Sequence, residues 1–97
     1  MDEAKVRKHA QAHGDAIAAG DFDRAMSDLT EDARAKVGPV AKALPRPVQR
    51  AEVVAAEPAG EEFIVRTRYV GAEDEATVEA RWAEEEGRPR ITSSAIV

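Results

Sequence analysis

The sequence contains no cysteine, and aromatic side chains make up only 4% of its 97 residues. Without cysteine, disulfide bonds and thiolate chemistry are excluded. Large apolar side chains are also scarce, because alanine alone accounts for 20 residues. At roughly 25 cal/mol for each Å² of apolar surface buried, such a core makes a monomer only marginally stable. The composition therefore leads us to expect a homodimer in which a sheet face is buried.

Long apolar runs are absent as well. No stretch approaches the ~20 residues of a membrane span, and the first residues, MDEAKVRKHAQ, hold no apolar signal-peptide core. The net charge is −5 and the arginines are scattered among glutamates, which argues against nucleic acids and anionic membranes as partners. We therefore expect a cytoplasmic protein with neither kind of partner. Its length and its 43% apolar composition fit one globular domain over residues 1–97.

The first half of the chain has the apolar spacing of helices. Val6, Ala10, His13 and Ile17 recur every three or four residues, which predicts one long helix. Its polar neighbours fall on the other faces of the helical wheel, so this helix is expected to bury one stripe.

Helix stop and start signals follow at once. Gly20 is expected to end the first helix, and Asp21 to cap the second. Thr30 is expected to cap a third helix, which Gly38-Pro39 must kink or divide. The second helix is expected to bury one face, formed by Phe22, Ala25 or Met26, and Leu29. About three helices are thus predicted, and the last of them ends at Pro45.

The second half alternates between apolar and polar residues, which is the period of half-buried strands. Strands are predicted at 63–70, 76–83 and 90–97, and a weaker one at 48–56. The segments between them, EPAGEE, GAEDE and EEEGRP, hold the glycines and charges of hairpin loops. Four strands joined by short loops form an antiparallel meander.

The loops also predict the strand registers, and these place the apolar residues on one face of the sheet. The predicted pairs are Tyr69–Ala76, Thr67–Val78, Val65–Ala80, Phe63–Trp82, Trp82–Ile91 and Ala80–Ser93. On the opposite face, Arg66 is expected beside Glu79 and close to Glu52. A slip of one residue in the third strand would instead turn Glu79 and Arg81 inward.

Helices followed by a meander with one apolar face predict an α+β domain whose sheet curls around a helix. The segment AHGDAIAAGDFDRAMSDLTEDA resembles the opening of nuclear transport factor 2-like (SnoaL-like, cystatin-like fold) domains. Those begin with a long helix, an Ala-Gly-Asp turn and a short helix that ends in a Leu-x-x-Asp-Ala pattern. The tail RWAEEEGRPRI is similar to their closing hairpin.

This resemblance implies a cone, in which a curved sheet wraps around the first helix and leaves a pocket at its open end. Some members of the superfamily are dehydratases, isomerases or epoxide hydrolases, whereas others bind ligands or mediate dimerisation. The chain departs from the usual pattern because it is short and because residues 31–44 have a helical pattern where a strand is often found. That departure is expected to narrow or close the pocket.

The two histidines allow two interpretations, a metal site or a structural role. His9 and His13 are four residues apart on one helix face, but a zinc site needs three or four ligands, and no third ligand can be argued. We therefore expect His9 to be solvated and His13 to pack at the rim of the helix–sheet interface. The acidic turns at 73–75 and 84–86 lack the ligand pattern of a calcium loop. No metal or cofactor is expected.

His13 is the titratable side chain expected to point toward the sheet, with Tyr69 as its partner, because the strand carboxylates fall outside or in turns. A His–Tyr pair can polarise a carbonyl group. A small isomerase or dehydratase-like enzyme that acts on a small apolar substrate is therefore the alternative function. One buried histidine in a helix is more often structural, so a non-enzymatic role is favoured.

The inward-facing residues could line a pocket for a small apolar ligand, or they could simply fill the core. The predicted pocket residues are His13, Ile17, Phe63, Val65, Thr67, Tyr69, Trp82 and Ser93. The function favoured by the sequence is a homodimeric interaction domain or a protein that binds a small apolar ligand.

Overall fold

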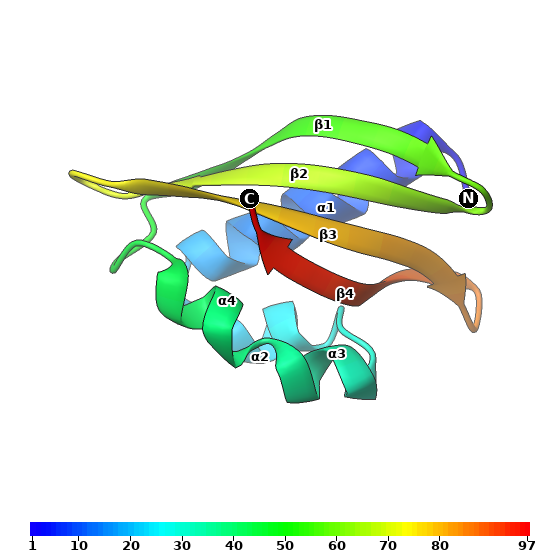
Figure 1. The fold of residues 1–97 in the computed structure, drawn as a ribbon, viewed down its shortest axis with the longest axis horizontal. Coiled ribbons are helices and arrows are strands. Elements are labelled where there is room, and N and C mark those ends of the chain that lie inside the picture. The colour runs from blue at the N-terminus through cyan, green and yellow to red at the C-terminus, as the bar shows by residue number, and fades with distance from the viewer.

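The computed structural model describes residues 1–97 and has an α+β architecture, as predicted. Four helices come first in the chain, namely α1 (Glu3–Ala18), α2 (Phe22–Met26), α3 (Glu31–Lys36) and α4 (Gly38–Ala43). Four strands follow, namely β1 (Arg50–Ala59), β2 (Glu62–Val70), β3 (Glu75–Glu85) and β4 (Arg88–Ile96). The strands form one antiparallel meander in the order β1-β2-β3-β4, and the helices pack against it (Figure 1).

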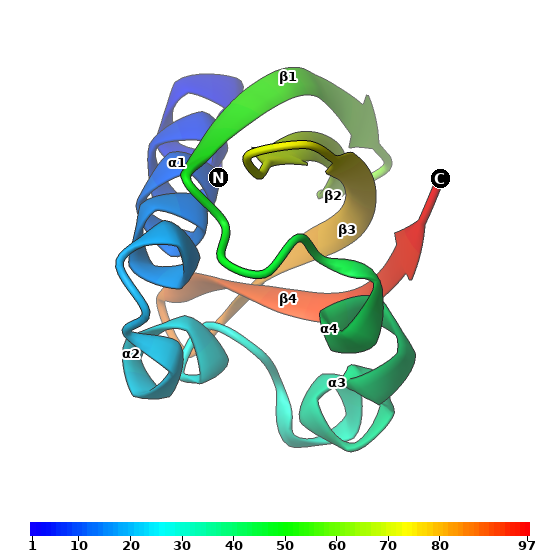
Figure 2. The same ribbon diagram turned by 90° about the vertical axis from the view of Figure 1, so that its left-hand side faces the viewer.

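The sheet is strongly curved. Figure 2 shows it curling from β1 to β4, with α1 along its open side and α3 and α4 beside β4. The concave face carries the apolar residues of β2 and β3, which alternate with half-buried or exposed polar residues on the outer face. None of the four helices combines the length and the hydropathy that a membrane crossing requires.

The helix boundaries follow the predicted caps. Asp21 caps α2, because its Oδ1 accepts a hydrogen bond from the Arg24 N–H at 3.2 Å. Thr30 caps α3 in the same way, by accepting from the Ala33 N–H at 3.2 Å. Gly20 lies between α1 and α2 with φ at +79°, a conformation that glycine adopts without the steric cost of a Cβ.

The third predicted helix is divided at Gly38-Pro39, one of the two outcomes that the sequence predicted. Residues 31–44 form two short helices, because α3 ends at Lys36 and α4 begins at Gly38, directly before Pro39. Proline lacks the N–H that a continuing helix needs, and its ring clashes with the preceding turn. The chain therefore changes direction there, and the two helices cover different parts of the concave face.

The register of β2 on β3 agrees with all four predicted pairs, from Phe63–Trp82 to Tyr69–Ala76. The pair Trp82–Ile91 is also confirmed, but the prediction that Ala80 pairs with Ser93 was wrong. The register shifts between Arg81 and Trp82, so that Ala80 lies opposite Ser94. An extra residue in one strand reverses the faces of all the residues beyond it.

The outer face of the sheet carries cross-strand ion pairs. Arg66 donates to Glu79 at 3.1 Å, as predicted. The expected contact of Arg66 with Glu52 was wrong, since Glu52 lies opposite Arg68 and accepts from it at 2.9 Å. Arg66 lies opposite Ala55 instead, on the other side of a register shift between Val53 and Ala55.

β1 covers Arg50–Ala59 rather than the predicted 48–56, so most of the expected loop EPAGEE belongs to strands. Pro58 pairs with Phe63 within this extension. Proline is tolerated here because β1 is an edge strand and one row of its backbone groups has no strand partner. The turn itself contracts to the residues around Gly60, which has φ at +66°.

At both edges of the sheet, other parts of the chain bond to some of the backbone groups that have no strand partner. The Gln11 side-chain amide donates to the Ala51 carbonyl at 2.8 Å and accepts from the Val53 N–H at 3.3 Å. At the other edge, the Ile91 N–H donates to the Asp28 carbonyl at 2.7 Å, and the Thr30 N–H donates to the Ile91 carbonyl at 2.9 Å. These bonds attach α1 to β1 and the segment after α2 to β4.

The interior divides into two clusters along α1. One end of the concave face, which we call the closed end, is filled by ten buried residues: Val6, Ala10, Leu29, Ala33, Ala56, Phe63, Val65, Ala80, Trp82 and Ile91. The second cluster surrounds an open space and consists of Ile17, Ala25, Val40, Val48, Ala51, Tyr69 and Val78. The prediction that Phe22 packs inside was wrong, since that side chain is 59% exposed.

Candidate functional site

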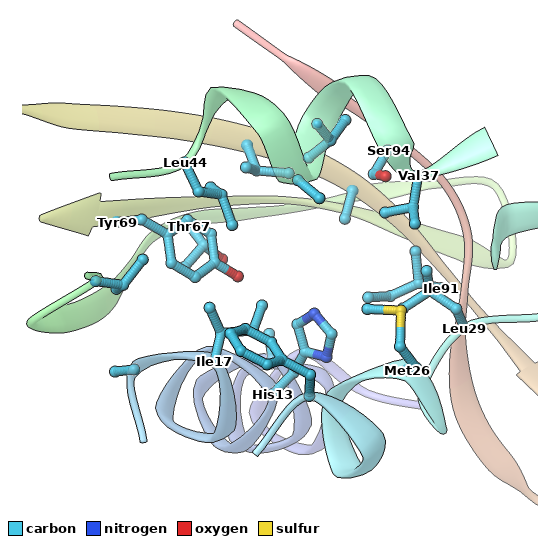
Figure 3. A pocket seen from close by; sticks show the side chains of 18 of the residues that line it. His13, Ile17, Met26, Leu29, Val37, Leu44, Thr67, Tyr69, Ile91 and Ser94 are labelled. Carbon is cyan, nitrogen blue, oxygen red and sulfur yellow. The ribbon is translucent and has the colours of Figure 1, made fainter. Parts of the chain in front are cut away.

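A cavity of about 420 Å³ lies between α1, the later helices and the concave face of the sheet. Sixteen of the 23 residues that line it are hydrophobic. Figure 3 shows His13 and Ile17 projecting into it from α1, Thr67 and Tyr69 from β2, and Val37 and Leu44 from the segment opposite. The helices at 31–44, which were expected to narrow or close such a pocket, form a roof and leave the space open.

The opening of the cavity is marked by the lining residues that are exposed to solvent. These are Gly20, Phe22, Ala41, Arg46 and Pro47. They belong to the turn between α1 and α2 and to the region from α4 to the residues before β1. A ligand would therefore enter between these two segments, and Phe22 would lie at the rim.

Small side chains account for much of the empty volume. The lining includes Ala18 on α1 and Ala41 on α4, and also Ala10 and Ala80, where the closed end borders the cavity. Each of them contributes a single methyl group, so the wall recedes wherever a leucine would have filled the space. The alanine-rich composition thus produces a cavity at one end of a sheet whose other end is filled by Phe63 and Trp82.

His13 lies on one wall of this cavity and pairs with the buried Asp28 behind it. The His13 Nδ1 is 3.0 Å from the Asp28 Oδ2, and the two residues are 8% and 2% exposed. The imidazole also meets the Trp82 ring edge to face, with the ring centroids 6.0 Å apart. These contacts fix the orientation of the His13 ring, which Figure 3 shows extending into the cavity.

Two arginines complete the surroundings of Asp28. Arg24 donates to its Oδ2 at 2.8 Å, and Arg88 donates to its Oδ1 at 2.9 Å. Burial by itself would raise the pKa of the Asp28 carboxyl, but the hydrogen bond and charge of His13, together with those of Arg24, hold that pKa below its usual value. Asp28 is therefore a carboxylate.

An ionised carboxylate can only accept hydrogen bonds, so the His13 Nδ1 must carry the proton that it shares with Asp28. In the neutral imidazole, the Nε2 is then an acceptor whose position is set by the Asp28 contact. His13 is therefore neither exposed to bulk solvent nor packed entirely within the core, because its ring lines the cavity.

Two hydroxyl groups on β2 face the same space. Thr67 and Tyr69 are 6% and 3% exposed, and both line the cavity. Burial raises the pKa of the Tyr69 phenol above its ordinary value. Tyr69 therefore keeps its proton and can serve as a hydrogen-bond donor, but it does not act as a base.

Five of the eight predicted pocket residues line the cavity, namely His13, Ile17, Thr67, Tyr69 and Trp82. Phe63 and Val65 face the same side of the sheet but belong to the closed end, beyond the cavity. Ser93 lies opposite Arg81 and is exposed, and its neighbour Ser94 lines the cavity instead, because of the register shift described above.

Asp28 was missed by the sequence reasoning. Its spacing of four residues from Arg24 is a signal for an ion pair on one helix face. That spacing does not indicate burial, which depends on the contact of the segment after α2 with β4 and on Arg88, 60 residues further along the chain.

The histidine pair suggested by sequence does not form a metal centre with the neighbouring acidic residues, since no group of three or more His, Asp and Glu side chains is placed to hold one ion. Burial lowers the pKa of His9, which is half-buried rather than solvated.

Comparison of the chain with models of protein families, with curated proteins and with solved structures gave no match.

Proposed function

We propose that this chain binds a small, mainly apolar molecule in the cavity and does so without catalysing a reaction. The observation that carries the proposal is a cavity of about 420 Å³ with a lining in which 16 of 23 residues are hydrophobic. Sites for small ligands typically have volumes of roughly 300–1,000 Å³ and combine apolar walls with a few polar groups. Here the polar groups are those of His13, Thr67, Tyr69 and Ser94.

The driving force would be removal of apolar surface from water, at roughly 25 cal/mol for each Å². Orientation would come from the few hydrogen bonds available in the lining. The order of helices and strands, together with a cavity at one end of a curved sheet, also supports the proposal that the domain has nuclear transport factor 2-like architecture.

Binding can be tested with propylbenzene and 4-propylphenol as probes. Trp82 is the only tryptophan and lines the cavity, so its indole N–H signal in NMR spectra reports on occupancy. We expect saturable shifts of this signal at probe concentrations up to about 1 mM, which corresponds to weak but specific binding. Saturation without any shift at Trp82 would place the probe elsewhere.

A matched pair of variants locates the site. Ser94→Phe adds a ring to the cavity wall, whereas Ser93→Phe adds the same ring one residue earlier, at an exposed position on the outer face. We expect Ser94→Phe to weaken probe binding by at least about tenfold, because the added ring fills the space. Ser93→Phe should bind like the parent chain. Equal binding by both variants would contradict the proposal.

A second candidate function is supported by the His13–Asp28 contact of 3.0 Å beside the cavity. In this enzyme, the His13 Nε2 would take a proton from the carbon next to a carbonyl group. The electron pair of the C–H bond would form a C=C bond while the π pair of the carbonyl group moves to its oxygen, which would accept a hydrogen bond from Tyr69. Return of the proton to a different carbon, or to the opposite face, would complete an isomerisation.

This alternative predicts solvent deuterium incorporation into 4-propylcyclohexanone next to its carbonyl group. His13→Gln should lower the rate by at least about 100-fold, the usual contribution of a general base. If the ketone binds and incorporates no deuterium beyond the rate with free imidazole, the non-enzymatic function stands.

The homodimer expected from the composition remains a prediction. The outer face of the sheet carries Arg66–Glu79, Arg68–Glu52 and Arg81–Glu62 ion pairs, which could exchange partners across an interface. Light scattering after size-exclusion chromatography decides the matter, since a stable species of 10.5 kDa would contradict it.

A further inference from the structure

We propose that the cavity selects uncharged hydroxyl compounds, whose hydroxyl group bonds to His13 and to the hydroxyls of β2 while the apolar body lies under the roof. This inference rests on the proposed binding function and adds to it the chemical class of the ligand.

The acceptor for such a ligand is the His13 Nε2. The His13 Nδ1 donates to the ionised Asp28 at 3.0 Å, so an imidazole that carries only this proton offers a lone pair at its other nitrogen. The ring cannot easily turn away, since it also packs against Trp82. A ligand O–H can donate to this nitrogen, whereas an ether or a hydrocarbon cannot.

The donors are the hydroxyls of Thr67 and Tyr69. Within the chain, side-chain hydroxyls donate hydrogen bonds at Ser27 and Thr92, and a third hydroxyl, that of Thr30, caps α3. The hydroxyls of Thr67 and Tyr69 are therefore free to bond to a ligand oxygen. Leaving them unpaired next to a purely apolar ligand would carry a desolvation cost.

These donors line the same cavity as His13. The position of a Cβ built on Gly14, the next residue of α1, is 3.6 Å from Thr67 Cγ2 and 3.8 Å from Tyr69 Cε1. Figure 3 shows Thr67 and Tyr69 side by side, with Met26, Leu29 and Ile91 across the cavity from them. A ligand therefore meets the hydroxyls of β2 on one side, apolar side chains on the other and the His13 ring between them.

The lining also argues against charged ligands. Its cations are limited to Arg46, which is exposed at the opening, so a buried carboxylate would have no guanidinium partner. A buried ammonium group would have no carboxylate partner either, since Asp28 does not belong to the lining and already has three donors. An unpaired charge in an apolar cavity carries a large desolvation penalty.

The test compares probes with one apolar body. We expect 4-propylphenol to bind at least about tenfold more tightly than 4-propylanisole and propylbenzene near neutral pH, which is the scale of one or two net hydrogen bonds. We expect 4-propylbenzoate and 4-propylbenzylamine to bind more weakly than the phenol by at least the same factor. The measurement is titration of the Trp82 indole signal.

The double variant Thr67→Val/Tyr69→Phe removes both donors while keeping the size of the side chains, and leaves the Asp28 network intact. It should reduce the preference for the phenol over propylbenzene to about threefold or less, the contribution of the His13 contact alone. The control Thr77→Val removes a hydroxyl from a residue of β3 that lies opposite Arg68 and does not line the cavity, and should keep the full preference.

The outcomes separate this inference from the function on which it rests. Equal binding of the phenol and propylbenzene would overturn the selectivity and leave apolar binding in place. Tighter binding of the benzoate or the amine would also overturn it. Binding of none of the probes would overturn both proposals.

Discussion

The two ends of the concave face are built from the same helix and the same strands, yet one is solid and the other is hollow. At the closed end, Phe63 and Trp82 fill the space between α1 and the sheet. At the other end, Gly14 lets α1 approach the sheet, and Ala18 and Ala41 leave the space above it unfilled. In a chain with few large apolar side chains, two aromatic residues close one end and the remaining volume becomes a cavity.

The boundary between the ends is where the polar chemistry lies. Trp82 belongs to the closed end and also lines the cavity, and it contacts the His13 ring. Asp28 supports His13 from behind and is held by Arg24 and Arg88. The solid end therefore provides a rigid support for the groups that face the hollow one.

The largest expected effect comes from opening the closed end. Trp82→Ala should lower the free energy of unfolding by about 4 kcal/mol, because it removes a side chain that is 1% exposed and joins its volume to the cavity. Phe22→Ala, at the 59% exposed rim, should change it by less than about 0.5 kcal/mol. Urea denaturation followed by circular dichroism measures both. Similar losses in the two variants would erase the distinction between a solid end and an open one.

Removal of the support for His13 should have the next largest effect. Asp28→Asn replaces a buried carboxylate that faces two guanidinium groups, so we expect a loss of about 3 kcal/mol near neutral pH. Asp32→Asn is the matched control, since Asp32 makes an exposed i,i+4 pair with Lys36 that contributes less than about 0.5 kcal/mol. The same denaturation experiment compares them.

The effect of Asp28 should depend on pH with a definite sign. Its pKa in the folded chain is lower than in the unfolded chain, so its stabilising contribution is complete above the ordinary carboxyl pKa of about 4. The contribution is lost as the pH falls from there through the folded pKa. The difference between the parent chain and Asp28→Asn should therefore narrow on acidification, and a constant difference would show that charge is not its cause.

The smallest effect tests the contact of α1 with the sheet beside the cavity. A Cβ at position 14 would lie 2.7 Å from the Ala51 Cβ, so Gly14→Ala should push α1 away from β1 and cost about 1–2 kcal/mol despite the better helix propensity of alanine. Gly38→Ala has no atom within 4 Å of the new methyl group and should be neutral or stabilising. Thermal unfolding compares the two, and stabilisation by both would show that α1 can shift freely.

The sequence predicted those features that depend on local chemistry. Caps such as Asp21 and Thr30, the division at Gly38-Pro39 and the pairing of β2 with β3 all follow from residues close to one another in the chain. The site was only partly predictable. The alternation of apolar and polar residues shows which side chains face inward, but it does not show where the filled core ends and the cavity begins. Phe63 and Tyr69 share a face, yet only Tyr69 reaches the cavity.

The failures share a physical origin in contacts between distant segments. Because of the register shift, Ser94 and not the predicted Ser93 lies on the cavity side of β4. No property of the isolated sequence of β4 distinguishes the two serines. Asp28 is buried because β4 binds the backbone beside it and Arg88 reaches it from the start of that strand. Such contacts form only when the whole meander is in place.

The bonds at both edges of the sheet bear on how copies of this chain can assemble. An uncovered edge strand is a template to which another chain can add a strand, which leads to continuous sheets and aggregation. Gln11 occupies backbone groups along β1, and the residues around Asp28 and Thr30 occupy those of Ile91 in β4. Strand addition is thereby hindered at both margins of the meander. If the predicted homodimer forms, the outer surface with its Arg66–Glu79 pair is available to it.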